Sequence, residues 1–346
     1  MDIGRRHLMA LSGSAALAGL MARPMVASAR PGSSKKIKAP RLRKGDTIGL
    51  ISPASPNRDR FDYQLADEVM IALGLVPKRG KYVGQDFGYF AATDEQRAAD
   101  VNAMFADKSV KAIMAIRGGW GCARILPYLD FDLIRKNPKP LIGYSDITAL
   151  HLALQAKTGL VSFHGPNATG TWGSQTVDSF VPILFGAAKQ KYANPVLEED
   201  RLVQKKWRTQ AITSGKAKGR LIGGNLTVMT ALVGTPYMPD MDGAILFLED
   251  VDEAEYRVDR MLTQMGQAGL LSGLAGVVFG QCSSCSTSSA FTLSDVLDQH
   301  IKPLGVPAYQ GAFFGHISNQ FTVPLGVDAE IDADKGTLRL LEAAVL

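Results

Sequence analysis

Short apolar runs alternate with helical segments along this chain, and the alternation restricts the possible folds more than any other feature. The runs have the length of buried strands, and helix signals such as the capping-box pattern of Thr93 and Gln96 lie between them. In the first half the predicted strands are 46–53, 111–116 and 141–143, and the predicted helices are 61–73, 93–105 and 146–155. Such alternation predicts an α/β fold with a mostly parallel sheet.

Three apolar runs end directly before a reactive side chain. Ser145 follows 141–144, Glu249 follows 244–248 and His316 follows 312–315. A residue just past a strand lies at the edge of a sheet, where open α/β folds bind their ligands. A serine, a carboxylate and a histidine are the parts of a hydroxyl nucleophile, an orienting anion and a general base, so a serine hydrolase is the leading hypothesis.

The alternating pattern weakens in the middle of the chain and then resumes. We predict an N-terminal α/β domain at 44–169, a connection at 170–218 and a C-terminal α/β domain at 219–346. The nucleophile candidate falls in the first domain, and the carboxylate and histidine candidates fall in the second. With 346 residues, 46% of them hydrophobic, the chain is long enough for two domains with large cores.

The first residues have the pattern of an export signal. Arg5-Arg6 precedes an uncharged segment from Leu8 to Ala22, and Ala27-Ser28-Ala29 is a small-x-small cleavage site. We predict a twin-arginine-like signal peptide at 1–29 and a periplasmic location, with an uncleaved membrane anchor as the alternative. Residues 30–43 are predicted to be a flexible linker.

Charge and hydropathy exclude two classes of partner. Loss of residues 1–29 would lower the formal net charge from +5 to +3, which removes the main support for a nucleic-acid partner. No later stretch approaches the roughly 18 uninterrupted apolar residues of a membrane-spanning helix. We therefore expect no stable membrane insertion after cleavage.

Ser145 lies between a predicted strand and a predicted helix. At such a junction a hydroxyl can project from a tight turn, with N–H groups and the positive helix end facing a developing oxyanion. Ile147 replaces the second glycine of the G-x-S-x-G pattern, so an ordinary α/β-hydrolase fold is not expected. The alternative is that Ser145-Asp146 only caps the helix.

A glycine-rich turn, Arg117-Gly118-Gly119-Trp120-Gly121, directly follows another predicted strand. Glycines allow the backbone to approach a ligand and to direct N–H groups toward it, which favours a cradle for an oxyanion or a carboxylate. Arg117 is available to bind a substrate carboxylate. An ordinary glycine turn is the alternative.

Glu249 needs a partner, and the chain offers more than one histidine. Because Glu249 ends five apolar residues, we expect it to be partly buried and paired. His151 and His300 fall in helical segments and are predicted to be structural or exposed. His164 follows a possible strand and competes with His316 for the role of base.

The three cysteines, Cys122, Cys282 and Cys285, do not predict a metal site. Cys282 and Cys285 form a C-x-x-C that can close a disulfide in an oxidising compartment. Zinc would require further ligands at matching spacing, which the chain lacks. We therefore expect no metal and no cofactor, and we keep a redox role as a weaker alternative.

Six blocks of sequence, taken in order, carry a family resemblance. They are 44–49, 117–121, 143–146, 223–226, 248–250 together with 256–260, and 314–316. With these blocks the chain resembles the LD-carboxypeptidase family of serine peptidases, which includes muropeptide LD-carboxypeptidases and microcin C self-immunity hydrolases. The resemblance covers nearly the whole mature chain. It implies a Rossmann- or flavodoxin-like N-terminal domain, a swivelling C-terminal α/β domain and a homodimer.

The resemblance also implies roles for individual residues. It makes Ser145 the nucleophile, with His316 and Glu249 as its partners, and it makes the backbone N–H groups of Gly119 and Asp146 the oxyanion donors. We predict substrate contacts by Arg117, Trp120 and Asn225. The implied reaction removes the terminal D-alanine from a peptidoglycan tetrapeptide, so the expected partner is a muropeptide or a stem peptide.

Export sets this chain apart from the many family members that are cytoplasmic recycling enzymes. An exported enzyme would lie beside the cell wall, which argues against the immunity branch because its nucleotide-peptide toxin acts in the cytoplasm. Two alternatives remain: a hydrolase of other peptide conjugates, and a periplasmic binding protein without activity. A binding protein would not require a serine, a glutamate and a histidine to converge.

Overall fold

Strands and helices alternate over most of the chain in the computed structural model, which describes residues 35–200, 202–287 and 290–346. The strands are β1 (Thr47–Ile51), β2 (Val76–Arg79), β3 (Val110–Ala115), β4 (Leu141–Gly143), β5 (Ser162–His164), β6 (Lys191–Tyr192), β7 (Gln210–Thr213), β8 (Lys216–Asn225), β9 (Ala244–Val251), β10 (Gly276–Ser283), β11 (Ala308–Gln310), β12 (Val323–Leu325), β13 (Asp328–Asp332) and β14 (Thr337–Leu340). The α-helices are α1 (Arg60–Ala72), α2 (Asp94–Ala106), α3 (Cys122–Ile125), α4 (Phe131–Lys136), α5 (Thr148–Thr158), α6 (Ser174–Leu184), α7 (Leu226–Ala231), α8 (Glu255–Gln267) and α9 (Leu293–Ile301). Short 3-10 helices are η1 (Leu126–Tyr128), η2 (Ser145–Ile147), η3 (Glu198–Asp200) and η4 (Lys302–Leu304). The predicted signal peptide at 1–29 lies outside the described residues.

The first sheet of the described chain has six strands in the order β12-β5-β4-β3-β1-β2. β1 to β5 are parallel, because a crossover containing a helix connects each of them to the next. The series β2-β1-β3-β4-β5 is the flavodoxin-like order, in which ligands bind beyond the carboxyl ends of the strands. The predicted parallel α/β sheet is therefore confirmed.

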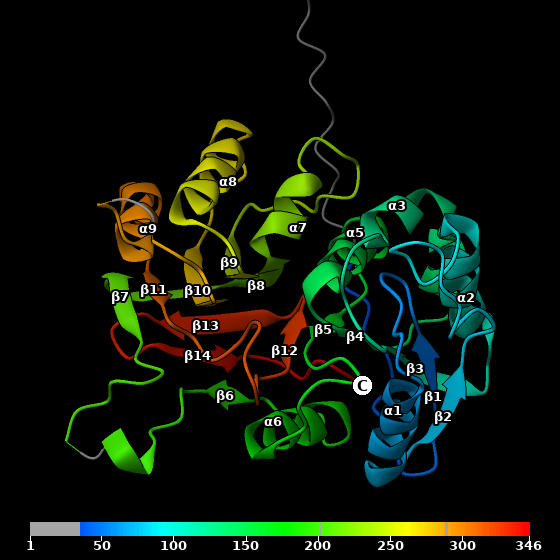
Figure 1. The fold of residues 1–346 in the computed structure, drawn as a ribbon. Helices are drawn as coiled ribbons and strands as arrows, with labels where there is room; N and C mark the ends of the chain where they lie inside the picture. Colours follow the sequence, from blue (N-terminus) through cyan, green and yellow to red (C-terminus); the bar gives the residue numbers. More distant parts are fainter. Residues whose placement is uncertain (1–34, 201, 288–289) are drawn as a thin grey trace, which may run out of the picture. The chain divides into compact units, whose positions relative to one another are not determined.

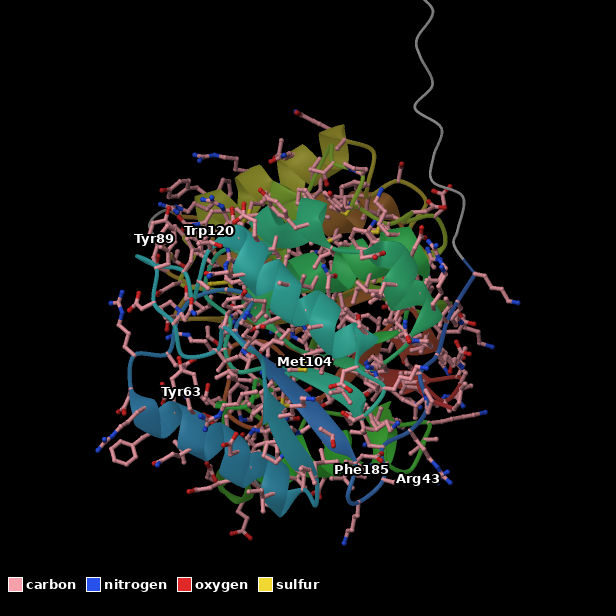
Figure 2. All side chains as sticks on the ribbon, turned by 90° about the vertical axis from the view of Figure 1, so that its right-hand side faces the viewer. Arg43, Tyr63, Tyr89, Met104, Trp120 and Phe185 are labelled. Carbon is pink, nitrogen blue, oxygen red and sulfur yellow. A yellow bond between two sulfur atoms is a disulfide. The ribbon has the colours of Figure 1, made fainter. Side chains whose placement is uncertain are left out.

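Local sequence signals explain how this sheet is covered. The predicted capping box forms, since the Gln96 N–H donates to Thr93 Oγ1 at 3.3 Å and the Thr93 N–H donates to Gln96 Oε1 at 3.2 Å. The helix that begins there, α2, packs on β1 through Met104 (Figure 2). Gly49 leaves the room for this contact, because a Cβ on it would lie 2.6 Å from Met104 Sδ.

The second sheet has eight described strands in the order β6-β14-β13-β8-β9-β10-β11-β7. Its centre, β8 to β11, is parallel, and antiparallel strands flank it on both sides. Helices α7, α8 and α9 lie along one face (Figure 1). The second half of the chain is thus also α/β, but with a mixed sheet.

One strand of the first sheet comes from far along the chain. β12 pairs antiparallel with β5, so that Val323 lies opposite His164. The predicted C-terminal segment therefore contributes a strand to the sheet of the N-terminal segment. The predicted connection at 170–218 likewise contributes β6 and β7 to the second sheet. The described residues from 35 onward belong to one compact unit, and the domain boundaries themselves stay a prediction.

The described part of the predicted flexible linker is packed. Ile37 forms a parallel bridge with Leu160, and Ala39 and Leu42 are buried. Lys38 Nζ forms an ion pair with Glu342 at 2.6 Å. Residues 37–42 therefore belong to the folded body, because buried apolar side chains and a distant carboxylate hold them there.

Two neighbouring glycines are required in β8, and one of them, Gly224, allows the second sheet to approach the first. Gly224 has a φ of +142°, and a Cβ on it would lie 2.4 Å from Thr148 Oγ1 at the start of α5. The next N–H, that of Asn225, donates to the same hydroxyl at 2.9 Å. A Cβ on Gly223 would lie 1.7 Å from the carbonyl oxygen of Phe247. Only glycine fits these two positions.

Within the described residues no helix combines the length and the apolar character that a membrane span requires.

Replacement of Gly224 tests the contact between the sheets. We expect Gly224→Ala to lower stability by about 1–3 kcal/mol, because the methyl group overlaps Thr148 and the backbone is strained. Gly234→Ala is the control, since its φ is also positive, at +84°, while no atom lies within 4 Å of its Cβ. Thermal unfolding measures both variants. Equal melting temperatures for the two would show that the close approach to Thr148 contributes nothing.

Candidate active site

Ser145 occupies a strained turn directly after β4. Its φ is +66°, a left-handed conformation that costs a residue with a side chain about 1–2 kcal/mol. Gly143 precedes the turn, and a Cβ on it would lie 2.9 Å from both Asn167 Oδ1 and Ile147 Cγ1. The turn thus has the strand-to-helix form of a nucleophile elbow although Ile147 replaces the second glycine.

A hydrogen-bond chain connects Ser145 to the second sheet. Ser145 Oγ lies 3.0 Å from His316 Nε2, and His316 Nδ1 lies 2.7 Å from Glu249 Oε2. With the proton on Nδ1, the imidazole donates to the carboxylate and accepts from the serine hydroxyl. This arrangement can remove a proton from the hydroxyl and return it to a leaving group. The structure therefore brings the three predicted residues together.

Glu249 lies inside a strand and not at its end. β9 continues through Val251, and Glu249 has no exposed surface. The sequence pattern predicted a strand that ended at Glu249; pairing with β10 extends it, since Asp250 lies opposite Cys282 and Val251 opposite Ser283. Gly315 lets the segment with His316 approach, because a Cβ on Gly315 would lie 3.0 Å from Glu249 Cβ.

The run before His316 is buried but is not a strand. β11 ends at Gln310, and 312–315 belong to the loop that leads to β12. Phe313 and Phe314 pack in the core, while the Phe314 carbonyl accepts from the Gln281 N–H at 3.0 Å. The prediction of a strand here was wrong, because an apolar run indicates burial without specifying strand pairing.

The electrostatics of His316 favour its charged form. Burial lowers its pKa, but the hydrogen bond to Glu249 and the charges of Glu249 and Asp250 outweigh burial and raise the pKa above the ordinary 6.5. The Tyr144 ring lies edge-on to the imidazole, with centroids 4.9 Å apart. Glu249 therefore makes His316 a stronger base and fixes its orientation.

The other histidines have different surroundings. His164 is fully buried, neither ring nitrogen has a hydrogen-bond partner among the described residues, and burial holds its pKa well below 6.5. His151 Nε2 lies 2.9 Å from the Gly143 carbonyl, and burial lowers its pKa to about 4. His300 pairs with Asp259 at 2.7 Å. The contact with Ser145 Oγ is made by His316, and not by its competitor His164.

The glycine-rich turn lies against Ser145. A Cβ on Gly118 would lie 2.8 Å from Ser145 Cβ. Gly119 has a φ of +122°, and a Cβ on it would lie 2.3 Å from Ser55 Oγ. Ser55 also accepts from the Trp120 N–H at 3.2 Å. Close packing on both sides thus holds this backbone beside the serine.

The carboxylate of Asp146 connects the two turns. It accepts from the Cys122 N–H at 2.7 Å. Burial raises the pKa of Asp146. The N–H groups of Cys122 and Gly121 and the charge of Arg97 lower the pKa, but burial outweighs them. Because Asp146 directly follows the serine, this buried carboxylate fixes the glycine-rich turn relative to Ser145.

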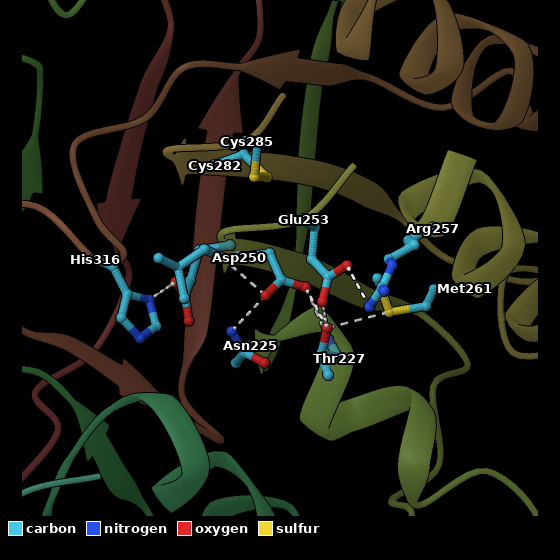
Figure 3. Close-up of a disulfide and its surroundings, with 11 residues drawn as sticks. Asn225, Thr227, Asp250, Glu253, Arg257, Met261, Cys282, Cys285 and His316 are labelled. Atoms are coloured by element: carbon cyan, nitrogen blue, oxygen red, sulfur yellow. Dashed lines mark hydrogen bonds and ion pairs between the residues drawn. A yellow bond between two sulfur atoms is a disulfide. The ribbon is translucent and has the colours of Figure 1, made fainter. Parts of the chain in front are cut away.

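Of the three residues predicted to contact the substrate, two are exposed and one is buried. Arg117 and Trp120 are exposed on the glycine-rich turn, and Arg117 Nη1 donates to the Pro56 carbonyl at 3.2 Å. Asn225 is buried and caps α7, because its Oδ1 accepts from the Val228 N–H at 3.0 Å. Its Nδ2 donates to Asp250 at 2.9 Å (Figure 3). The structure thus gives Asn225 a structural role beside the site.

A small cavity of about 250 Å³ opens beside His316. Its lining residues are Tyr144, Pro166, Thr169, Gly170, Thr171, His316, Ile317, Ser318 and Gln320. Apart from His316, none of these residues was predicted from the sequence as part of the site, and neither was Gly315. Tyr144 and Gly315 could have been found, because each directly precedes a candidate residue. The loop residues carry no signal of their own, since they come from two segments that only the fold brings together.

Cys282 and Cys285 form a disulfide at the end of β10 (Figure 3). Cys122 is free and buried. Within the described ranges, no three His, Cys, Asp or Glu side chains are grouped so that they could hold a metal ion.

Replacement of the buried carboxylate tests the electrostatics of His316. In Glu249→Gln the negative charge is lost and burial remains, so we expect the pKa of His316 to fall below that of the unaltered protein. Asp250→Asn is the control and is expected to lower the pKa less, because Asp250 is the weakest of the contributions. NMR titration of the imidazole measures each value. An unchanged pKa in Glu249→Gln would contradict the assigned contact.

Comparison with known proteins gives the site a family context. Residues 48–165 match the family model described as LD-carboxypeptidase N-terminal domain, and residues 218–331 match the LD-carboxypeptidase C-terminal domain. The chain is 39% identical over 316 residues to the "Probable murein peptide carboxypeptidase" of Bacillus subtilis, which covers 90% of this chain and 96% of that protein. It is 31% identical over 303 residues to the "Murein tetrapeptide carboxypeptidase" of Pseudomonas aeruginosa, which covers 83% of this chain and 94% of that protein.

Solved structures have the same fold. A structure of MccF in complex with glutamyl sulfamoyl guanosine aligns with a TM-score of 0.81 at 29% identity, covering 89% of this chain and 99% of that one. Together with the family models, this likeness confirms the resemblance carried by the six sequence blocks. The chain belongs to the LD-carboxypeptidase family of peptidases.

Proposed function

We propose that this carboxypeptidase is of the serine type and removes the terminal D-alanine from peptidoglycan tetrapeptides. The hydrogen-bond chain from Ser145 through His316 to Glu249 is the observation that carries the proposal. The named function of the relative from Pseudomonas aeruginosa supports the substrate. The bond to be cleaved joins the L-centre of a diamino acid to D-alanine.

In the proposed mechanism, His316 Nε2 takes the proton of Ser145 Oγ as the oxygen attacks the carbonyl carbon of the diamino acid. The tetrahedral intermediate collapses when the C–N bond breaks and His316 gives the proton to the nitrogen of D-alanine. A water molecule, deprotonated by His316, then attacks the acyl carbon, and His316 returns the proton to Ser145 Oγ as the ester bond breaks. Glu249 holds the imidazole tautomer and stabilises its cation in both steps.

The oxyanion of the intermediate requires N–H donors, and two turns can supply them. The Gly119 and Asp146 N–H groups belong to the two turns that the Asp146 carboxylate fixes together. One such donor contributes roughly 3–4 kcal/mol to the stability of a transition state. This contribution depends on preorganisation, which the close packing of Gly118 on Ser145 provides.

The cavity beside His316 is suited to the leaving amino acid. Because His316 must protonate the amine, D-alanine leaves on the side of this imidazole. A volume of about 250 Å³ holds a small residue, and Thr169, Thr171 and Ser318 are among the residues that line it. The Thr169 hydroxyl donates to the Ile116 carbonyl at 2.8 Å. We propose that Thr171, Ser318 and the exposed Arg117 share recognition of the terminal carboxylate.

A second candidate activity is hydrolysis of an aminoacyl sulfamoyl nucleoside. The high structural similarity to MccF, bound in one structure to glutamyl sulfamoyl guanosine, favours it. The two candidates use the same nucleophile and differ in the leaving group. A comparison of both substrates under identical conditions distinguishes them.

Removal of the nucleophile tests the mechanism. We expect Ser145→Ala to abolish release of D-alanine from a tetrapeptide muropeptide while the fold remains intact, because the variant lacks the hydroxyl that contacts His316 Nε2. Ser272→Ala is the matched control; its exposed hydroxyl donates to the Gly269 carbonyl. Mass spectrometry of tri-, tetra- and pentapeptide products measures the outcome. Undiminished release by Ser145→Ala, or trimming of the pentapeptide alone, would refute the proposal.

We also propose that the chain is exported to the periplasm, where it trims stem peptides of the wall. The twin-arginine pattern at Arg5-Arg6 supports this location. Replacement of both residues by lysine is expected to retain the protein in the cytoplasm, whereas Arg23→Lys is expected to leave export unchanged. Cell fractionation measures the distribution. Equal periplasmic fractions for all three chains would contradict the twin-arginine route.

A further inference from the structure

Two large aromatic side chains are exposed beside the glycine-rich turn. Tyr89 is 59% exposed and Trp120 is 47% exposed. Both lie at the same edge of the molecule (Figure 2). Phe90 lies between them, with its ring centroid 4.3 Å from that of Tyr89 and 6.3 Å from that of Trp120. We call Tyr89, Phe90 and Trp120 the aromatic shelf.

The shelf is held in place by its central ring. The guanidinium groups of Arg97 and Arg124 lie 4.7 and 4.8 Å from the Phe90 centroid. A Cβ on Gly121 would lie 2.8 Å from the Phe90 ring, so the glycine-rich turn packs directly on it. Phe87 and Phe90 exchange backbone hydrogen bonds of 2.8 and 3.1 Å. The two exposed rings therefore belong to an ordered surface.

The shelf is continuous with the surroundings of the nucleophile. Gly118 packs on Ser145, and Trp120 follows two residues later, a backbone distance of at most about 7 Å. The cavity proposed for D-alanine is lined by other segments, 166–171 and 316–320, and by no shelf residue. The shelf is thus available to the part of the substrate that stays on the enzyme after the first step.

We propose that the aromatic shelf binds an N-acetylated amino sugar of the substrate, an inference that rests on the proposed function. In a muropeptide the stem peptide is joined through its N-terminus to such a sugar. The three residues before the cleaved bond span about 10 Å when extended. That length exceeds the backbone distance of at most about 7 Å from Gly118, which packs on Ser145, to Trp120.

The chemistry of the shelf fits a pyranose ring. An aromatic face carries negative partial charge, and it attracts the slightly positive C–H groups that project from one face of a sugar. Stacking also removes apolar surface of both rings from water. The substrate class is therefore the glycan-linked peptide, with the free stem peptide as a poorer substrate.

The first test compares a disaccharide tetrapeptide with the free tetrapeptide. We divide kcat/KM for the disaccharide tetrapeptide by kcat/KM for the free tetrapeptide. We expect Trp120→Ala and Tyr89→Ala each to lower this ratio roughly three- to tenfold, because each raises KM for the glycan-linked substrate. Trp120→Phe keeps an aromatic face and is expected to restore most of the ratio. Phe61→Ala, which removes an exposed ring outside the shelf, is the matched control. A ratio unchanged in both alanine variants would overturn the inference.

A binding measurement separates this inference from the proposed reaction. The probe is a tetramer of N-acetylglucosamine, added to Ser145→Ala and followed by tryptophan fluorescence and by saturation-transfer NMR. We expect weak binding that Tyr89→Ala reduces and Phe61→Ala retains. Binding that persists equally in Tyr89→Ala overturns the shelf whatever the activity. If the unaltered protein releases D-alanine from none of the substrates, the proposed function is overturned. Sugar binding to Ser145→Ala is measured independently of that outcome.

Discussion

The hydrogen bond between Glu249 and His316 is the interaction on which the candidate site depends. Glu249 has no exposed surface, and an ionised carboxylate in such a place is strongly unfavourable without a partner. His316 is that partner at 2.7 Å, and Gly315 makes the approach possible. The imidazole is fixed by the second sheet, and its free nitrogen is thereby directed to Ser145 beside the first. A buried charge in one sheet thus orients a hydroxyl on the other.

Local signals allowed much of the fold and the site to be predicted from sequence. The capping box of Thr93 and Gln96 located α2, and the run before Ser145 located β4 and its turn. These features depend on neighbouring residues, so their pattern is visible in the chain. The position of Glu249 in a buried run also predicted its need for a partner, because burial of a carboxylate follows from its apolar neighbours.

What could not be predicted depends on contacts between distant residues. The run before His316 is apolar because Phe313 and Phe314 fill the core, and no periodicity distinguishes that from a strand. Residues 37–42 have the composition of a linker, yet their partners Leu160 and Glu342 lie far along the chain. The pairing of β12 with β5 is equally invisible, since a three-residue strand carries little pattern.

The position of β12 in the first sheet has a consequence for the newly made chain. Ser145 is separated from His316 by 171 residues, and the sheet beside Ser145 is complete only after Leu325 has been added. At a synthesis rate of roughly 5–20 residues per second, about 10–30 s pass between the appearance of the hydroxyl and that of its base. During this interval Ser145 has no contact with His316, and the first sheet lacks β12. A nascent chain therefore cannot form the hydrogen-bond chain from Ser145 to Glu249 until His316 has left the ribosome, and its first sheet is complete only when β12 has followed.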